Sequence, residues 1–555
     1  MIETDTLQLR KQRGAFFTPY AIAQHLADWA LRGQGNSGLV LDPSCGDGVF
    51  LVAAAERLRN EGRSGRLFGV DIHAGSLEQT KLSLDIGSSN PESSLLLGDF
   101  FNELTPGQFG ARLPFVDAVI GNPPFIRYQG QNLSSRQSGS AAALAQGVRI
   151  SGLASSWAPL LVHSSAFLKP DGRIAMVLPA ELLSVGYAEP IRQWLKRRFR
   201  SVHLVLFEEL QFSGVEEQVV LLVARGTGGC NAFTLHHVSN SSELKDLHIY
   251  DADAFAPQAV GKWTDLLIPE EARGVLRRIT DDSFTPLSDY ATCELGTVTG
   301  ANSFFTMSDA TKREYKFQEG RQVQRCVPPG TKHLRGLHFT EAQWEQSRLD
   351  GLRVWMLNPT TNSQSGALAT YLKVGVALKV PEAYKCTVRS PWWKPPVVEP
   401  PDLFFTYMSH IAPRLITNDC DATFVNSMHG VSLRPREQRW LKQAIPVMSL
   451  NSVTLLGAEI VGRAYGGGIL KLEPTEAAAM PLPDRDAMKA AWEILKPQRS
   501  KINELVSSGM WNAASLEVDE ALLTSTLNIE RSKQDTIRSA LYKIRSRRIG
   551  KSDAS

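Results

Sequence analysis

The sequence predicts an α/β domain with a mostly parallel, doubly wound sheet, followed by a second domain of mixed α+β structure. Short apolar runs alternate with helix-like stretches from residue 14 to about residue 240, which is typical of a parallel sheet covered by helices on both faces. A polar, irregular passage follows, and beyond it the pattern is rich in Gly, Pro and aromatic residues. At 555 residues the chain is also too long for one ordinary domain.

Seven apolar runs are predicted to form the strands of the first domain. Helix-like stretches at 48–60 and 187–199 lie between some of them and would serve as crossover connections. The runs are residues 39–45, 65–72, 94–101, 116–124, 172–180, 202–210 and 217–224. The predicted organisation is a first domain over 1–240, a junction over 241–285, a second domain over 286–483 and a helical region over 484–555.

Composition excludes several classes of protein. Hydrophobic residues make up 43% and charged residues 21%, which is too balanced for a disordered chain. No apolar run approaches the roughly 18–20 residues that cross a bilayer, and the first residues lack an apolar signal-peptide core. The six cysteines are scattered without a CxxC pair, which favours a reducing cytoplasm and predicts no disulfide framework and no metal site. A net charge of +3 does not by itself indicate a nucleic-acid partner.

A Gly-rich turn follows the first predicted strand. Residues 42–48 read DPSCGDG and lead directly into a helix, where glycines allow close approach of a ligand and free N–H groups are available. Asp71 ends the next strand, where it can accept hydrogen bonds from ribose hydroxyls, and Asp99 follows the third, where it can accept one from an adenine amine. Three successive acids at strand ends predict a nucleoside cofactor. The glycine spacing is not GxGxxG, so a dinucleotide is the weaker interpretation.

The tetrapeptide Asn122-Pro123-Pro124-Phe125 directly follows the fourth apolar run, at the sheet edge where α/β folds bind their ligands. An exocyclic amine on a base is a poor nucleophile, because its lone pair is delocalised into the ring. Acceptors at the Asn122 side chain and the Pro123 carbonyl would bind both N–H bonds and direct the lone pair, while Phe125 would stack on a flipped base. The motif therefore predicts transfer to an amine without a covalent intermediate.

The 42–48 loop resembles the S-adenosylmethionine loop of class I methyltransferases. With the NPPF motif and a long region after it, the chain resembles the gamma-class, TaqI-like DNA N6-adenine methyltransferases of restriction–modification systems. The resemblance implies a Rossmann-like S-adenosylmethionine-dependent domain, a DNA target-recognition domain, and methylation of a flipped adenine in double-stranded DNA. It extends to residues 13–19, which resemble the family's most N-terminal motif, and to 169–183.

The resemblance also implies a set of site residues. Phe125 and Phe212 would stack on the target base, beside the catalytic Asn122, Pro123 and Pro124. Two positions depart from the family, because Phe125 stands where a Tyr is more common and Leu160 where some members have an aromatic residue. The implied cofactor contacts are Phe17, Thr18, Pro19, Asp42, Pro43, Ser44, Cys45, Gly46, Gly48, Asp71, Ile72, Asp99, Phe100 and Asn122.

A basic and aromatic segment in the second half is the predicted DNA-reading surface. Between residues 371 and 394 five basic residues stand against one acid, with Tyr and Trp interleaved, which suits phosphate contacts beside base contacts. The alternative is a strand pair with one solvated face and one packed aromatic face. A second candidate is the basic tail 531–551, whose alternative is a solvated helix. The predicted DNA contacts are Lys379, Lys385, Arg389, Trp392 and Trp393.

Other functions remain open on the sequence. N4-cytosine methylation fits the same acceptor pair, and RNA or protein-glutamine methyltransferases also use NPP(Y/F). A catalytically silent DNA-specificity subunit is the alternative from another class, against which the intact 42–48 and 122–125 motifs argue. No Pro-Cys step is present for C5-cytosine chemistry, and no PD…(D/E)xK pair for cleavage, so a restriction endonuclease would be a separate protein.

Overall fold

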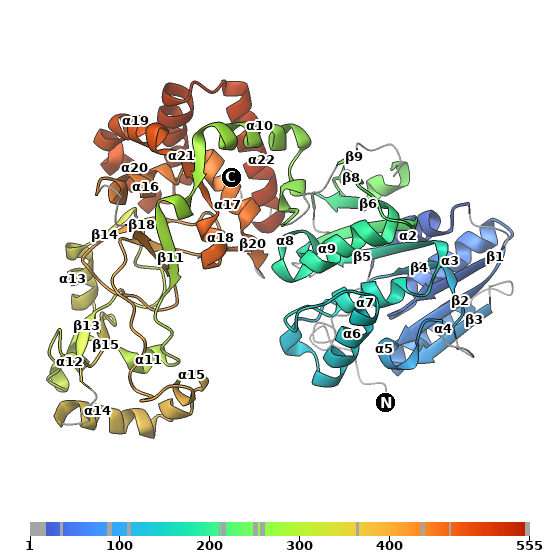
Figure 1. Cartoon of the computed structure of the whole chain (residues 1–555), viewed down its shortest axis with the longest axis horizontal. Helices are drawn as coiled ribbons and strands as arrows, with labels where there is room; N and C mark the ends of the chain where they lie inside the picture. Colours follow the sequence, from blue (N-terminus) through green and yellow to red (C-terminus); the bar gives the residue numbers. More distant parts are fainter. Residues whose placement is uncertain are drawn as a thin grey trace. The chain divides into compact units, whose positions relative to one another are not determined.

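The computed structural model describes residues 18–33, 37–85, 92–107, 113–209, 211, 218–247, 254–255, 261–361, 366–434, 439–465 and 468–549. Its contacts divide the chain into two compact units, Met1–Leu267 and Ile268–Ser555, which are coloured blue to green and yellow-green to red in Figure 1. The boundary lies inside the 241–285 passage, where α10 (Glu270–Ser283) already belongs to the second unit.

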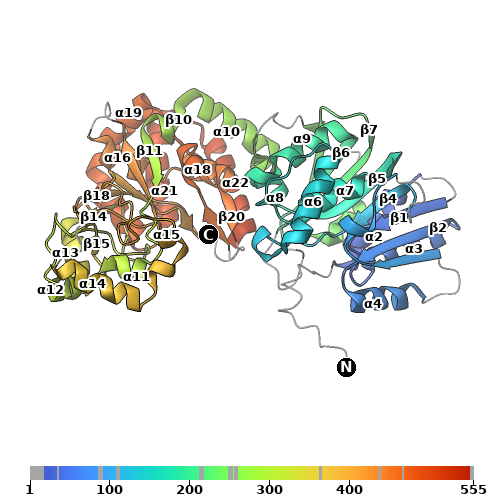
Figure 2. The same cartoon turned by 60° about the horizontal axis from the view of Figure 1, so that its bottom comes forward.

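A nine-stranded sheet forms the centre of the first unit, in the order β3-β2-β1-β4-β5-β7-β6-β8-β9. Strands β1 to β5 pair in parallel, and β7 is antiparallel to both β5 and β6. The predicted strands are all present, and the order confirms the class I, Rossmann-like fold. The strands are β1 (Ser37–Asp42), β2 (Ser64–Asp71), β3 (Glu92–Leu97), β4 (Val116–Gly121), β5 (Leu168–Pro179), β6 (Phe199–Phe207), β7 (Val219–Thr227), β8 (Phe233–Val238) and β9 (Ala254–Phe255). Figure 2 shows β1, β2, β4 and β5 side by side.

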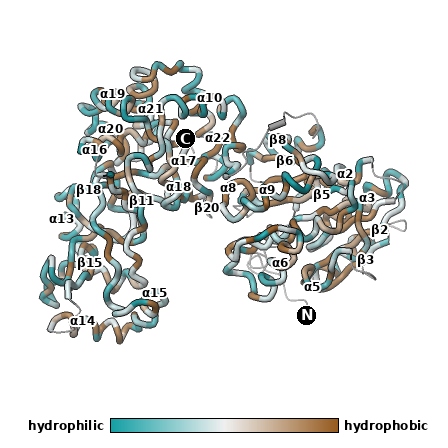
Figure 3. Tube along the Cα trace, viewed as in Figure 1, coloured by the Kyte–Doolittle hydropathy of each residue, from teal (hydrophilic) through white to brown (hydrophobic). Residues whose placement is uncertain are grey.

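Helices cover both faces of this sheet because alternate strand residues enter two different cores. On β4, Ala118 and Ile120 pack with α2, α3 and α4, whereas Val119 packs with α5, α7 and α9. Figure 3 shows the hydrophobic stretches along these central strands, as expected of strands buried on both sides. The helices are α2 (Tyr20–Leu31), α3 (Val49–Asn60), α4 (Ala74–Asp85), α5 (Phe100–Glu103), α6 (Leu133–Ala145), α7 (Trp157–Ser165), α8 (Glu181–Ser184) and α9 (Glu189–Arg198).

The second unit has the predicted mixed α+β character, with four small sheets in place of one large one. A five-stranded sheet has the order β11-β19-β16-β18-β14, two sheets have three strands each, and β10 pairs with β22. The strands are β10 (Phe284–Pro286), β11 (Ala291–Leu295), β12 (Thr306–Met307), β13 (Val323–Arg325), β14 (His338–Thr340), β15 (Trp355–Leu357), β16 (Leu403–Phe405), β17 (Met408–Ser409), β18 (Leu415–Asp419), β19 (His429–Leu433), β20 (Arg463–Tyr465), β21 (Ile469–Lys471) and β22 (Pro481–Pro483).

Helices of this unit lie both before and after β19 in the chain, and α22 packs against both α10 and α17. Residues after 484 therefore share one compact unit with those before. The helices are α11 (Asn302–Phe305), α12 (Asp309–Glu314), α13 (Glu341–Leu349), α14 (Gly366–Ala377), α15 (Tyr384–Thr387), α16 (Leu441–Met448), α17 (Ser452–Val461), α18 (Pro474–Ala478), α19 (Arg485–Leu495), α20 (Arg499–Ser507), α21 (Trp511–Asp519), a π-helix (Glu520–Thr526) and α22 (Arg531–Ile549).

No single helix in the described parts of the chain is long and apolar enough to cross a membrane. The helices α16 and α17 are long and apolar enough only when they are taken together, and the chain bends by 79° between them. Nearly all of their residues are buried within the second unit.

Candidate functional site

The loop between β1 and α3 is a tight turn held by backbone hydrogen bonds. Cys45 N donates to Val70 O at 2.9 Å, and Gly48 N donates to Cys45 O at 2.8 Å. Gly46 and Gly48 have φ angles of +53° and +84°, a region that side-chain-bearing residues seldom occupy. The two glycines thus allow the turn that carries the 42–48 loop across the carboxyl end of the sheet.

Asp71, at the end of β2, ties this loop to the neighbouring strand. One carboxylate oxygen accepts from Gly46 N at 2.9 Å and the other accepts from His73 N at 2.8 Å. Each carboxylate oxygen can accept a second hydrogen bond, so Asp71 keeps capacity for a hydroxyl of a ligand. It lies beside the loop, as predicted for the acid that binds ribose.

Asp99 caps the short helix α5, where its carboxylate accepts from Phe101 N at 3.0 Å and from Ser135 Oγ at 3.0 Å. The ring of Phe100 is buried, with its centroid 5.0 Å from that of His163. The Phe100 ring packs in the core beneath α7, and its contact with the cofactor adenine stays a prediction. Ile72 is the apolar side chain that stands exposed at this edge.

Asn122 follows β4 and meets Thr18, which lies 104 residues earlier in the chain. Asn122 Nδ2 donates to Thr18 Oγ1 at 3.2 Å, and Pro19 is the N-cap of α2. Asn122 Oδ1 is buried and has no hydrogen-bond partner among the described residues. The structure therefore brings together two motifs that the sequence keeps far apart, and it leaves the amide oxygen free to accept.

Two further orphaned acceptors lie at the end of β1. Asp42 Oδ2 and Ser44 Oγ are buried without a hydrogen-bond partner within the described ranges, while Asp42 Oδ1 accepts from Ser44 N at 3.1 Å. Burial above all, with the nearby carboxylates of Asp71 and Asp47, raises the pKa of Asp42 to about 8. Buried polar groups normally have partners, so these atoms fit a polar ligand such as the predicted cofactor.

Gly121, the last residue of β4, keeps β1 and β4 close at this point. A Cβ atom there would stand 2.7 Å from Asp42 Oδ1. Cys45 is buried as well, and burial raises the pKa of its thiol. Cys45 is thus a packing residue of the loop and no nucleophile, because the thiolate is the reactive form.

Phe125 is partly buried and packs against both cores of the first unit. The backbone around it contacts Ser156, whose hydroxyl donates to Pro124 O and accepts from Ile126 N. The pair Ser155-Ser156 before an apolar stretch predicts a helix start, but nothing in the sequence indicates a contact with the NPPF segment.

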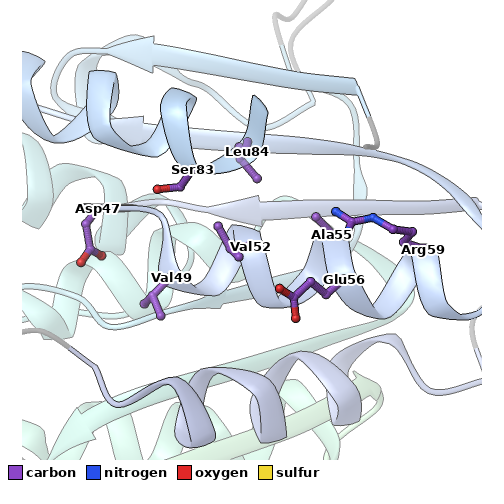
Figure 4. A pocket seen from close by; sticks show the side chains of 8 residues that line it. All are labelled: Asp47, Val49, Val52, Ala55, Glu56, Arg59, Ser83 and Leu84. Carbon is purple, nitrogen blue, oxygen red and sulfur yellow. The ribbon is translucent and has the colours of Figure 1, made fainter. Parts of the chain in front are cut away.

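A shallow groove of about 390 Å³ lies along α3 and α4, and Figure 4 shows its lining side chains. Of the 42–48 loop it includes Asp47 alone, and its other lining residues come from the two helices. The three orphaned acceptors lie outside its lining, so we assign the candidate site to the strand ends and not to this groove. Within the described ranges no three His, Cys, Asp or Glu side chains gather to hold a metal ion.

The predicted DNA-reading segment is helical, comprising α14, a 3₁₀ turn (Val380–Glu382) and α15, so the strand-pair alternative is wrong. Lys379 and Lys385 are exposed. Between them and around them, Val376, Leu378 and Tyr384 are also exposed, the last at 74%.

Three other predicted DNA contacts have structural roles. Arg389 donates to the backbone oxygens of Thr299 at 2.9 Å and Val298 at 3.2 Å, and its guanidinium lies over the Phe305 ring. Trp393 is buried at 1% exposure, and Trp392 packs on Phe304 with a centroid distance of 5.8 Å. Trp393 cannot face DNA as predicted, because it is buried in the core beneath α14, whereas Arg389 and Trp392 are partly exposed and their contact with DNA stays a prediction.

The basic tail forms α22 and neutralises buried acids. Arg548 binds both carboxylate oxygens of Glu459, at 3.0 and 2.6 Å, and Arg538 Nε donates to Asp519 at 2.9 Å. Glu459 and Asp519 are almost fully buried. Both arginines are therefore structural, and the tail is not a free basic arm. Phe17 and Phe212, which were predicted to contact the cofactor and the target base, lie outside the described residues.

Comparisons with known proteins identify two families along the chain. Residues 1–248 match the model of the N-6 DNA Methylase family, and residues 260–523 match that of the C-terminal domain of Type II methyltransferase M.Eco57I. The chain is 21% identical over 506 residues to Type II methyltransferase M.AccI of Acinetobacter calcoaceticus, covering 85% of each. It is 23% identical over 489 residues to Type II methyltransferase M.XamI of Xanthomonas campestris pv. amaranthicola, covering 86% of each. The fold resembles that of DrdV in a DrdV–DNA complex, with a TM-score of 0.50 and 12% identity over 90% of this chain and 57% of that one.

Proposed function

Since the chain joins an N-6 DNA methylase domain to a C-terminal domain of the M.Eco57I type, as in the DNA N6 methyltransferases of restriction–modification systems, we propose that it methylates the N6 amine of adenine. The substrate is double-stranded DNA, from which the target base is flipped into the strand-end site of the first unit. S-adenosylmethionine, when bound, supplies an electrophilic methyl group. A separately encoded endonuclease would perform cleavage.

One observation carries this proposal. Asn122 Oδ1 is buried without a partner among the described residues, while Nδ2 is held by Thr18 Oγ1 at 3.2 Å. An amide whose nitrogen is already bound presents its oxygen as the acceptor, and that oxygen suits an N–H donor such as the exocyclic amine. A preorganised acceptor of this kind needs no reorganisation when the reaction begins.

The chain's own groups then divide the work. Asn122 Oδ1 and the Pro123 carbonyl accept from the two N–H bonds of the amine, which directs its lone pair toward the methyl group. The ring of Phe125 stacks on the flipped base. Asp71 would accept hydrogen bonds from the ribose hydroxyls of the cofactor. The Ser44 hydroxyl and the Asp42 carboxyl would form hydrogen bonds with other polar groups of the cofactor. Asp99, already bonded to Ser135, is the acceptor for the adenine amine of the cofactor.

The second unit is the DNA-recognition unit in this proposal, with α14–α15 as the contacting segment. Residues 366–389 contain four basic residues and one acid, and Lys379 and Lys385 are exposed. Exposed lysines neutralise phosphates without reading sequence, while the exposed apolar side chains between them suit contact with bases or sugars. Arg389 is partly exposed and already bonded to the backbone oxygens of Val298, Thr299 and Trp392, so this proposal assigns it no base contact.

The test is transfer of labelled methyl from S-adenosylmethionine to unmethylated duplex DNA, followed by digestion to nucleosides. We expect the label in N6-methyldeoxyadenosine. Label in N4-methylcytosine would change the target base but keep the amine chemistry. Label appearing only when tRNA or a glutamine-containing protein is offered would overturn the DNA assignment. Sequencing of the modified DNA then gives the recognition site.

A further inference from the structure

Ser156 occupies the N-cap position of α7 but makes no side-chain hydrogen bond to its own helix. Its backbone angles are helical (φ −59°, ψ −28°), and a serine that caps a helix has extended angles instead. The hydroxyl donates to Pro124 O and accepts from Ile126 N at 2.9 Å. It thus bonds the segment that follows Asn122 and not its own helix.

The two groups that Ser156 binds lie on either side of Phe125. Pro124 O belongs to the peptide before Phe125, and Ile126 N belongs to the peptide after it. Ser156 N also donates to Ile126 O at 3.0 Å. One residue thus fixes both peptide planes that set the direction of the Phe125 ring, and it does so from a different element of the fold.

The hydrogen bonds of Ser156 to residues 124 and 126, which we call the Ser156 clamp, are themselves held in place. Gln131 Nε2 donates to Ile126 O at 2.7 Å and to Ala154 O at 3.1 Å, which joins the two chain segments that form the clamp. Because Gln131 holds this junction, Ser156 has little freedom to follow the NPPF segment if that segment moves. The neighbouring Ser155 hydroxyl is not part of the clamp: it donates to Glu181 at 3.2 Å, and Glu181 accepts a second bond from Tyr187.

We propose that Ser156 is a positioning residue for methyl transfer, acting through the backbone of Phe125 on the stacking of the flipped base. This inference rests on the proposed function, because it assigns Phe125 the target base. Ser156 has no role in holding the cofactor, since its contacts with the motif are with residues 124 and 126 and not with the 42–48 loop.

The test compares three variants of the full chain on a duplex whose modified adenine has been mapped. Ser156→Ala removes the clamp, Ser156→Thr keeps the hydroxyl, and Ser155→Ala removes an adjacent buried hydroxyl that contacts Glu181 and Tyr187. With saturating cofactor and DNA, Ser156→Ala should lower the single-turnover rate about 10–100-fold, as expected for a misplaced reacting group. Cofactor affinity should be unchanged, and Ser156→Thr and Ser155→Ala should retain the wild-type rate.

Two local readouts separate positioning from folding. With 2-aminopurine as the target base, Ser156→Ala should fluoresce more strongly than wild type, because a stacked ring quenches the probe. The Ile126 amide should exchange its hydrogen faster in Ser156→Ala alone. A wild-type rate for Ser156→Ala, an equal loss in Ser155→Ala, or a parallel loss of cofactor affinity would overturn the inference. If wild type methylates no DNA amine, the proposed function fails and the catalytic role falls with it, whereas faster Ile126 exchange would still support the clamp.

Discussion

Replacing Asn122 by Ala removes the orphaned acceptor at the end of β4 and leaves the rest of the strand-end cluster in place. The loss of one preorganised polar contact in an active site lowers the rate about 10²–10³-fold. We therefore expect Asn122→Ala to lose methyl transfer by this factor. The measurement is single-turnover transfer of labelled methyl to duplex DNA at saturating cofactor.

The same change should cause little or no loss of stability, which distinguishes a catalytic role from a structural one. An orphaned buried acceptor costs about 1–3 kcal/mol, and the bond from Nδ2 to Thr18 contributes about 0.5–1.5 kcal/mol. Removing both should change the free energy of unfolding by about −0.5 to +2.5 kcal/mol, where a positive value means greater stability. Calorimetry of the two proteins measures this difference.

Asn418→Ala is the matched control. Asn418 is fully buried, and its Nδ2 donates to Pro401 O at 2.9 Å and to Ala422 O at 3.1 Å. Truncating it leaves those partners unpaired, and the expected loss is at least about 1–3 kcal/mol of stability with methyl transfer intact while the protein is folded. A wild-type rate in Asn122→Ala would refute the catalytic assignment. A loss of more than about 3 kcal/mol of stability in Asn122→Ala would show that Asn122 stabilises the fold, because the two contributions given for its side chain allow a loss of only about 0.5 kcal/mol.

Three further expectations follow from the same geometry. Asp71→Ala should weaken S-adenosylmethionine binding in calorimetry, because it removes the carboxylate that also holds Gly46 N. Lys379→Ala or Lys385→Ala should lower the slope of log affinity for DNA against log salt by about 0.9 per lost phosphate contact, equally on all sequences. The pKa of the Asp42 carboxyl is about 8 in the folded protein and 3.8 in its ordinary state, so between these pH values the folded protein holds a proton that the unfolded chain lacks. The stability of wild type should therefore fall as pH rises through this range. Replacing Asp42 by Asn should remove this pH dependence.

Each expectation has a control and a contradicting outcome. Asp85→Ala removes an exposed carboxylate at the end of α4 and should not affect cofactor binding; equal affinities in both variants would move the ribose acceptor elsewhere. Lys489→Ala, on an exposed face of α19, should leave the salt slope unchanged, and a steady slope in all the lysine variants would remove α14–α15 from the DNA surface. Urea unfolding between pH 5 and pH 8 tests Asp42, and identical pH profiles for wild type and variant would mean that this carboxyl is ionised when folded.

The fold of the first unit was predictable because its pattern is local and repeated. Each apolar run ends in a turn with Gly, Pro or an acid, and a chain of such units leaves few alternatives to a parallel sheet. The extra strands β8 and β9 were not predicted; in β8 only three of six residues are buried, so its apolar pattern is weak. In the second unit, Val374, Val376 and Leu378 stand at alternate positions as in a strand, but residues 373–377 belong to α14 and a turn follows. Tertiary packing favours the helix over a strand in this segment, because Gly375 allows α14 to approach Phe304 and Trp392 closely.

The candidate site shows the same division between local and distant information. The loop 42–48 and the NPPF segment are local signals, and the structure brings both to one sheet edge. The contact of Asn122 with Thr18 was not predicted; the resemblance implied only that each of the two contacts the cofactor. The Ser156 clamp joins residues about 30 apart in the chain, and no local pattern in the sequence indicates that contact. The backbone contacts of Arg389 were unpredictable for the same reason, because their carbonyl acceptors lie about 90 residues earlier.

The ion pair between Arg548 of α22 and Glu459 affects the order in which the chain becomes functional during synthesis. Arg548 leaves the ribosome after every other described element of the second unit, yet it neutralises a carboxylate buried in α17. Until it arrives, that anion would be buried without its partner, which costs about 3–5 kcal/mol when such a pair is broken. Domains tend to fold in the order of their synthesis, so we expect nascent chains to carry a finished first unit while the second unit is still open. Commitment to a DNA site would then wait for the last helix.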